Sequence, residues 1–283
     1  MFSLELESDE AAKDLLIAEL WEQGSAGITE TELSAGRYLL RTFFEPAADA
    51  DSLLRLFAGH HPRLETTAPR DWIAESRTGW EPLPVGDRFY LVPEWRDDPA
   101  PPGRVRIAIN PGLACGTGYH EATQLCLEAI ERYADPGTCV LDAGCGAGIL
   151  SIAAALLGAG KVIACDVDPA AVEIAASAFA RAGICVLLFT GPVAAIGCAS
   201  ARLILCNISA AASIELAGEL LRCLEVRGRC VVSGFEDFES AAVEAALERA
   251  GGAIEARLAK GVWRAFVVTR TENRPGQSES NPV

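Results

Sequence analysis

Residues 139–169 read CVLDAGCGAGILSIAAALLGAGKVIACDVDP, and this stretch decides the fold. The short apolar run Cys139–Leu141 is typical of a strand that is buried on both faces. Three alternate glycines follow it, and then comes an apolar segment that ends at Gly158. A second apolar run, Val162–Cys165, is followed directly by Asp166. The stretch therefore predicts a strand, a glycine loop, a helix and a second strand, with room for a ligand above the glycines.

The spacing of the glycines and the nearby carboxylates suggests which ligand this is. A dinucleotide site needs glycines in the order G-x-G-x-x-G, because a pyrophosphate lies against the helix N-terminus. Ile149 or Ser151 stands where the third small residue belongs. Asp142 suits a ligand that carries an ammonium group, such as S-adenosylmethionine, and Asp166 is placed to accept hydrogen bonds from ribose hydroxyls. A nicotinamide or flavin site and a plain glycine turn remain alternatives.

Strands and helices alternate through the rest of this region. The patterns predict strands at 88–92, 105–109, 139–141, 162–165, 185–189, 203–206, 229–233 and 262–269, and helices at 122–133, 149–157, 170–182, 213–224 and 238–250. Such alternation predicts an α/β fold with a parallel, doubly wound sheet. Ligands bind beyond the carboxyl ends of such strands. Because Asp142, Asp166 and Asn207 each come directly after a strand, we expect them to face one crevice.

The N-terminal part of the chain has another pattern. Strand-like runs at 2–7, 26–33, 38–44 and 63–67 and amphipathic helices near 12–21 and 50–59 occur in the order β-α-β-β-α-β. That order is typical of a small ferredoxin-like α+β domain. We expect this domain over 1–68, a helical linker over 69–81, the α/β domain over 82–272 and a disordered tail over 273–283.

Composition restricts the partners and the compartment. The net charge of −15 argues against binding nucleic acid through its phosphates. The N-terminus lacks a basic segment, and no apolar run approaches the ~20 residues that span a membrane. The ten cysteines include no Cys-x-x-Cys pair, and apolar runs hold Cys139, Cys165, Cys185 and Cys230. We expect these four to be buried thiols in a cytoplasmic protein that has no metal site and no membrane contact.

The loop at residues 110–123, NPGLACGTGYHEAT, resembles the signature D-P-G-x-A-F-G-T-G-x-H-x-T-T of the PrmA family. The stretches VLDAGCGAGILSIAA and ACDVDPAAV are similar to its cofactor motifs, and DWIAESRTGWEPLPVGDRFYLVPEW is similar to its tryptophan-rich linker. The pair Asn207-Ile208 matches the start of its N-I-L-A motif. The chain departs from the family pattern at Asn110, Cys115, Ala122, Arg202 and Ser209, and it has no carboxylate between Gly183 and Ser200.

This resemblance implies a class I methyltransferase fold and S-adenosylmethionine as cofactor, with S-adenosylhomocysteine as product. It implies a protein substrate, the eleventh large-subunit ribosomal protein, methylated at lysines and at its N-terminal amine. It also implies that the small N-terminal domain binds the substrate and moves on the linker. Carried over by position, the cofactor-binding residues are Gly116, Thr117, Gly118, His120, Thr123, Asp142, Gly144, Gly146, Asp166 and Asn207.

Asn207 is the candidate catalytic residue. Methyl transfer from a sulfonium is an in-line displacement, so the enzyme must aim a neutral amine at the methyl carbon. The side-chain oxygen of Asn207 would accept an N–H bond from that amine. Three readings remain open beside it: Asn207 as a turn or cap residue, methylation of another protein or a small amine, and a module that binds the cofactor without turnover.

Overall fold

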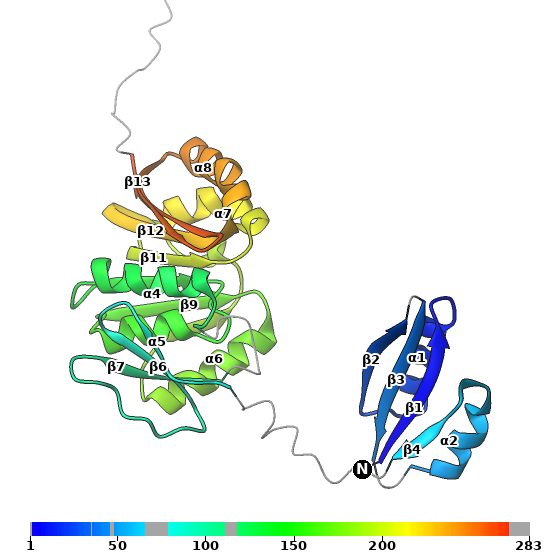
Figure 1. Ribbon diagram of the computed structural model, residues 1–283. Helices are drawn as coiled ribbons and strands as arrows, with labels where there is room; N and C mark the ends of the chain where they lie inside the picture. Colours follow the sequence, from blue (N-terminus) through cyan, green and yellow to red (C-terminus); the bar gives the residue numbers. More distant parts are fainter. Residues whose placement is uncertain (1, 35, 46–47, 66–78, 111–117, 272–283) are drawn as a thin grey trace, which may run out of the picture. The chain divides into compact units, whose positions relative to one another are not determined.

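The computed structural model describes residues 2–34, 36–45, 48–65, 79–110 and 118–271 (Figure 1). The chain divides into two compact units, Met1–Gly79 and Trp80–Val283. Most of the predicted linker, the loop at 111–117 and the predicted tail lie outside the described residues. The domain boundaries given above therefore stay predictions.

The first unit has the predicted order of elements. These are β1 (Phe2–Asp9), α1 (Lys13–Glu22), β2 (Gly27–Ser34), β3 (Arg37–Phe44), α2 (Ala50–Leu56) and β4 (Arg63–Glu65). The strands form an antiparallel sheet in the order β2-β3-β1-β4. Alternate side chains of a strand share one face, so Leu4 and Leu6 of β1 pack together in a core with residues of both helices. A small α+β domain is confirmed.

The second unit begins with a small sheet and continues as the large α/β domain. Its elements are β5 (Leu83–Val85), β6 (Phe89–Pro93), β7 (Val105–Ile109), α4 (Glu121–Tyr133), β8 (Cys139–Ala143), α5 (Ile149–Leu156), β9 (Lys161–Asp166), α6 (Pro169–Ala182), β10 (Leu187–Thr190), β11 (Ala201–Asn207), α7 (Ala210–Cys223), β12 (Leu224–Glu236), α8 (Ser240–Arg249), β13 (Gly252–Lys260) and β14 (Trp263–Arg270). The strands β5, β6 and β7 form their own sheet, and their side chains join the core beside α5.

The large sheet has the strand order β10-β9-β8-β11-β12-β14-β13. Its first five strands are parallel, as predicted, but β14 is antiparallel to both of its neighbours. The prediction of an all-parallel sheet was therefore wrong at this edge, and it missed β13 altogether. The reason is that β13 is an edge strand in which Glu255 and Arg257 alternate with the apolar residues Ile254, Ala256 and Leu258, so it lacks the continuous apolar run of a buried strand.

The core of this unit lies on both faces of the large sheet. Because successive side chains of a strand point to opposite faces, Val140 belongs to the cluster that contains α4, α5 and α6. Leu141, the next residue, belongs to the cluster that contains α7 and α8. Figure 1 shows these helices covering the sheet. The doubly wound fold is thus confirmed, and the chain order reverses between β8 and β11.

The structure also tests the predicted burial of four cysteines and the expected lack of membrane-spanning helices. Cys165 and Cys230 are buried and Cys139 is partly buried, but Cys185 is exposed, so the prediction of a buried thiol was wrong there. Cys185 lies between Gly183 and β10, outside any strand, which explains its exposure. Among the helices of the described part of the chain, none is long and apolar enough to cross a membrane.

Candidate functional site

A cavity of about 610 Å³ lies at the carboxyl ends of the central strands, where the strand order reverses. This is the position at which doubly wound sheets bind their ligands. The cavity is lined by six of the predicted site residues: His120, Thr123, Gly144, Gly146, Asp166 and Asn207. Gly118 is described but does not line it, and Gly116 and Thr117 lie outside the described residues.

The glycine loop forms the floor of this cavity. Gly144, Gly146 and Gly148 have φ values of 72°, 52° and 81°, which L-residues with a side chain seldom adopt. A Cβ on Gly144 would lie 2.6 Å from Cγ2 of Ile208, another residue that lines the cavity. The backbone N–H groups of Gly144 and Cys145 donate to the carbonyl oxygen of Cys165, at 2.9 and 3.0 Å, and so hold the loop against β9.

Asp166 lies at the end of β9 and its carboxylate is held in place from two sides. One oxygen accepts a hydrogen bond from the backbone N–H of Gly146 at 2.9 Å, and the other accepts one from Asp168 at 3.0 Å. Each carboxylate oxygen has a second lone pair. The group is therefore fixed in orientation and able to accept hydrogen bonds from hydroxyls of a ligand in the cavity.

Asp142 lies beneath the cavity and not in its lining. Its side chain is only 1% exposed, and one carboxylate oxygen accepts bonds from the backbone N–H and the hydroxyl of Ser151, at 3.0 and 2.7 Å. Burial raises the pKa of Asp142 to about 6, although the two Ser151 bonds oppose the shift. Asp142 thus fixes the first turn of α5 behind the glycine loop, and its direct contact with a cofactor stays a prediction.

Asn207 ends β11 and is joined to α4 by a hydrogen bond in the lining of the cavity. Its side-chain nitrogen donates a hydrogen bond of 3.1 Å to the hydroxyl oxygen of Thr123, which is 1% exposed. The two residues are 84 positions apart in the chain, so only the tertiary structure brings them together. This bond uses the amide nitrogen and leaves the amide oxygen available as an acceptor.

His120 and Trp263 form an aromatic wall of the cavity. His120 is the N-cap of α4, and its Nδ1 atom accepts the backbone N–H of Ala122 at 3.3 Å. The ring of Trp263 meets that of His120 edge to face, with centroids 4.2 Å apart. Sequence reasoning did not find Trp263 or Gly234, both of which line the cavity. Trp263 is in β14 and Gly234 is in β12, and these two strands pair with Trp263 opposite Glu236.

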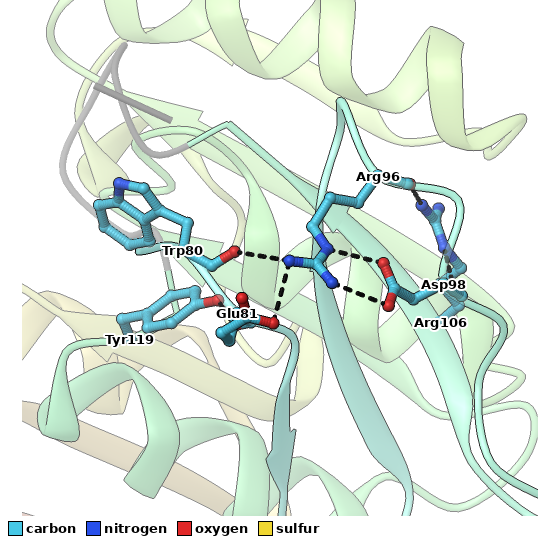
Figure 2. Close-up of polar contacts among 6 residues, drawn as sticks. All are labelled: Trp80, Glu81, Arg96, Asp98, Arg106 and Tyr119. Atoms are coloured by element: carbon cyan, nitrogen blue, oxygen red, sulfur yellow. Dashed lines mark hydrogen bonds and ion pairs between the residues drawn. The ribbon is translucent and has the colours of Figure 1, made fainter. Parts of the chain in front are cut away.

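A network of polar contacts supports the residue before His120 (Figure 2). The hydroxyl of Tyr119 donates to the backbone carbonyl of Glu81. The rings of Tyr119 and Trp80 pack edge to face, with their centroids 4.7 Å apart. Arg96 donates to the carboxylate of Asp98 and forms an ion pair of 2.9 Å with Glu81. Figure 2 shows Arg96 between the segment of Trp80 and Asp98. The start of the second unit is thereby tied to the start of α4.

The backbone of Arg96 and Asp98, at the centre of this network, is itself held by hydrogen bonds. Arg106 of β7 donates to the backbone carbonyls of Arg96 and Asp98, at 2.6 and 3.2 Å. The side-chain hydrogen bond to Asp98 is the main reason that the pKa of Arg96 is raised, and the same bond lowers the pKa of Asp98. The backbone around Tyr119 therefore rests on a chain of interactions that runs through the small sheet.

Comparison with known proteins agrees with this architecture. The family described as "Ribosomal protein L11 methyltransferase (PrmA)" matches residues 5–271. The protein of the same name from Pelobacter propionicus is 33% identical over 253 residues, which is 78% of this chain and 82% of that protein. The one from Geobacter sulfurreducens is 34% identical over 242 residues, 81% of this chain and 80% of that protein. Among solved structures, a ribosomal protein L11 methylase from Lactobacillus delbrueckii subsp. bulgaricus aligns with a TM-score of 0.63 at 29% identity, covering 68% of this chain and 99% of that one.

Proposed function

Because the chain belongs to the ribosomal protein L11 methyltransferase (PrmA) family, we propose that it methylates amines of ribosomal protein L11 with S-adenosylmethionine as donor. The amines in question are lysine side chains and the N-terminal amine of the substrate. The observation that carries the proposal is the meeting of Asp166, the glycine loop and Asn207 around one cavity at the topological switch point.

The residues present fit this cofactor. Gly144 and Gly146 line the cavity with backbone alone, and a Cβ at Gly144 would lie 2.6 Å from Ile208, which also lines it. The Asp166 carboxylate accepts hydroxyl hydrogen bonds, as the two ribose hydroxyls require, and no phosphate group has to be placed near it. Ile149, Leu150 and Ile208 supply apolar lining for the rest of the nucleoside. When bound, S-adenosylmethionine supplies a methyl group on a positively charged sulfur.

Asn207 is proposed to aim the acceptor amine. Its amide nitrogen is engaged by Thr123, so its amide oxygen is the group that remains to accept an N–H bond. An amine that donates an N–H to Asn207 keeps its lone pair unused, so the lone pair would be available to a methyl group bound in the same cavity. Positioning of this kind accounts for most of what a displacement at a methyl carbon needs from an enzyme.

The cavity also favours the neutral form of the amine. Ile149, Ile208 and Trp263 surround it with apolar surface, and removal from water lowers the pKa of an amine. The Nδ1 atom of His120 accepts a backbone N–H, so the proton of a neutral ring is on Nε2. His120 is therefore assigned to shape the cavity with Trp263, and no strong base is invoked. Methylation of a cytoplasmic ribosomal protein would place the enzyme in the cytoplasm.

The test is methyl transfer by the purified full-length chain. Labelled S-adenosylmethionine and purified ribosomal protein L11 should give labelled L11, with the modified amines identified by mass spectrometry. Asn207→Ala should abolish most of the turnover while calorimetry finds the cofactor affinity nearly unchanged. Cofactor binding without transfer to ribosomal protein L11 would instead favour another amine substrate or a binding module. A chain that does not bind S-adenosylmethionine would contradict the proposal altogether.

A further inference from the structure

Two exposed hydrophobic side chains lie beside the aromatic wall of the cavity. Phe238 is 81% exposed and Val262 is 55% exposed. Phe238 belongs to the short 3₁₀ turn Asp237–Glu239 that follows β12, and Val262 precedes the first residue of β14. A single exposed hydrophobic residue is ordinary, whereas exposed hydrophobic residues grouped near a site are candidates for contact with a partner.

Hydrogen bonds join the two turns to one another and to the cavity. The backbone N–H of Asp237 donates to the carbonyl oxygen of Val262 at 3.0 Å. The guanidinium of Arg264 donates to the carboxylate of Asp237 at 2.9 Å. Trp263, which stands between Val262 and Arg264, pairs in register with Glu236 and lines the cavity. The turns that carry Val262 and Phe238 are therefore held together next to Trp263, which lines the cavity.

Acidic side chains surround this surface. Glu236, Asp237 and Glu239 flank Phe238 along the chain, and the exposed Glu121 follows His120 at the start of α4. Glu236 and Glu239 cap the 3₁₀ turn, which keeps their carboxylates at this edge. The nearby cations are Arg264, which is paired with Asp237, and Lys260, which lies opposite Trp263 in the β13–β14 pairing and is paired with Glu128. The four carboxylates of Glu121, Glu236, Asp237 and Glu239 outnumber these two cations, so the surface attracts positive charge.

We propose that Phe238, Val262, Glu236, Asp237 and Glu239 form a docking lip for the basic polypeptide segment that carries the target amine. The inference rests on the proposed function and names the surface by which the methyltransferase unit holds that segment. The target amine is cationic in solution, so the carboxylates of the lip attract it before it loses its proton in the cavity. Phe238 provides apolar area outside the cavity, which a small amine would not reach but the residues flanking a target in a polypeptide would cover.

The test uses two substitutions that remove the same aromatic ring and add opposite charges. Phe238→Arg and Phe238→Glu in the full chain should both raise the KM for ribosomal protein L11, because each loses the burial of an aromatic side chain, worth about tenfold for partial burial. The arginine variant should lose more than the glutamate variant, since it repels a basic segment. The values of kcat and of the cofactor Kd should stay within about twofold of the wild type, because Phe238 lies outside the cavity.

Matched controls and a binding assay make the result decisive. Val226 is also exposed and lies near the other end of β12, so Val226→Arg and Val226→Glu should leave KM unchanged. Equal KM values for the wild type and both Phe238 variants would overturn the lip, and equal losses in the two variants would overturn its preference for a basic partner. Binding of fluorescent ribosomal protein L11 is measured in parallel. If the wild type binds it and transfers no methyl group, the proposed function fails, while the order of affinities among the Phe238 variants still decides the lip.

Discussion

The side-chain nitrogen of Asn207, at the end of β11, lies 3.1 Å from the hydroxyl oxygen of Thr123 of α4, and both residues line the cavity. Thr123 is in the first turn of α4 and is almost completely buried. The bond therefore comes from a rigid element, and with the amide nitrogen facing Thr123 the amide oxygen is left to accept. The hydrogen bond to Thr123 thus fixes the orientation of the Asn207 side chain, and its amide oxygen can accept a hydrogen bond.

Thr123→Val should lower kcat about tenfold, because it keeps the shape of the side chain and leaves the Asn207 amide nitrogen without its partner. Thr123→Ser should restore most of the lost turnover, since the hydroxyl returns. Steady-state kinetics on ribosomal protein L11 would measure both. If Thr123 acts through Asn207, the double variant Thr123→Val with Asn207→Ala should be no slower than Asn207→Ala alone. Additive losses would show that Thr123 acts by another route.

Asp166→Ala should weaken S-adenosylmethionine binding by about 1–3 kcal/mol, the cost of leaving buried hydrogen-bond partners unmatched. Asp168→Ala is a suitable control, because Asp168 caps the neighbouring helix α6 and does not line the cavity. That variant should lose about 1 kcal/mol of unfolding free energy and keep its cofactor affinity. Calorimetry and thermal melts distinguish the two. Equal cofactor affinities in the wild type and Asp166→Ala would show that Asp166 does not bind the cofactor.

Asp142 should make stability depend on pH in a defined window. Its pKa is about 6 in the folded protein against an ordinary value of 3.8, so the folded state holds a proton that the unfolded state has lost. This contribution to stability is present at low pH and is lost as the pH rises from about 4 to about 6. In Asp142→Asn the loss is absent, so the variant should gain about 3 kcal/mol relative to the wild type between pH 4 and pH 7.

Denaturant unfolding of both proteins at a series of pH values would measure this difference. Ser151→Ala provides an internal check. The hydroxyl bond from Ser151 lowers the pKa of Asp142, so its removal should shift the window to higher pH. A difference between wild type and Asp142→Asn that is constant across the whole range would mean that Asp142 is not protonated in the folded protein.

Tyr119→Phe should raise the cofactor Kd a few-fold and lower the melting temperature slightly. The substitution keeps the ring contact with Trp80 and removes the hydrogen bond to Glu81, which is worth about 1 kcal/mol. Because Tyr119 directly precedes His120, the loss of this hydrogen bond should increase the mobility of His120 at the start of α4, where His120 lines the cavity. Tyr90→Phe, in strand β6 of the same small sheet, removes a hydroxyl without breaking this network and should have no effect on the Kd. Identical behaviour of the two variants would separate the network of Figure 2 from the site.

Gly144→Ala should close part of the cofactor cavity. Its φ of 72° strains any L-residue by about 1–2 kcal/mol, and the added Cβ would lie 2.6 Å from Ile208. Gly137 has a similar φ of 82° with nothing within 4 Å of its added Cβ. Gly137→Ala therefore introduces the backbone strain without a steric contact. Gly144→Ala should lose more thermal stability than Gly137→Ala because of the contact with Ile208, and only Gly144→Ala should lose cofactor affinity. Unchanged affinity would mean that Ile208 moves aside freely.

Local features of the sequence were sufficient for the fold class and for the family. The apolar run, the positive-φ glycines and Asp166 lie within about 30 residues, and their preferences act over one or two elements. Together with the family resemblance they predicted the central strands and six of the fourteen described residues that line the cavity. The unit at the N-terminus was equally readable, because its strands and helices differ in the period of their apolar residues.

The tertiary structure alone decided the features that depend on pairing between distant segments. The antiparallel strand β14 brings Trp263 beside His120, and no local pattern specifies that register. Three other features arise in the same way: the burial of Asp142, the bond from Asn207 to Thr123 and the bond from Asp237 to Val262. Each results from packing elements that are far apart in the chain, where the free energy belongs to the contact and not to either segment by itself.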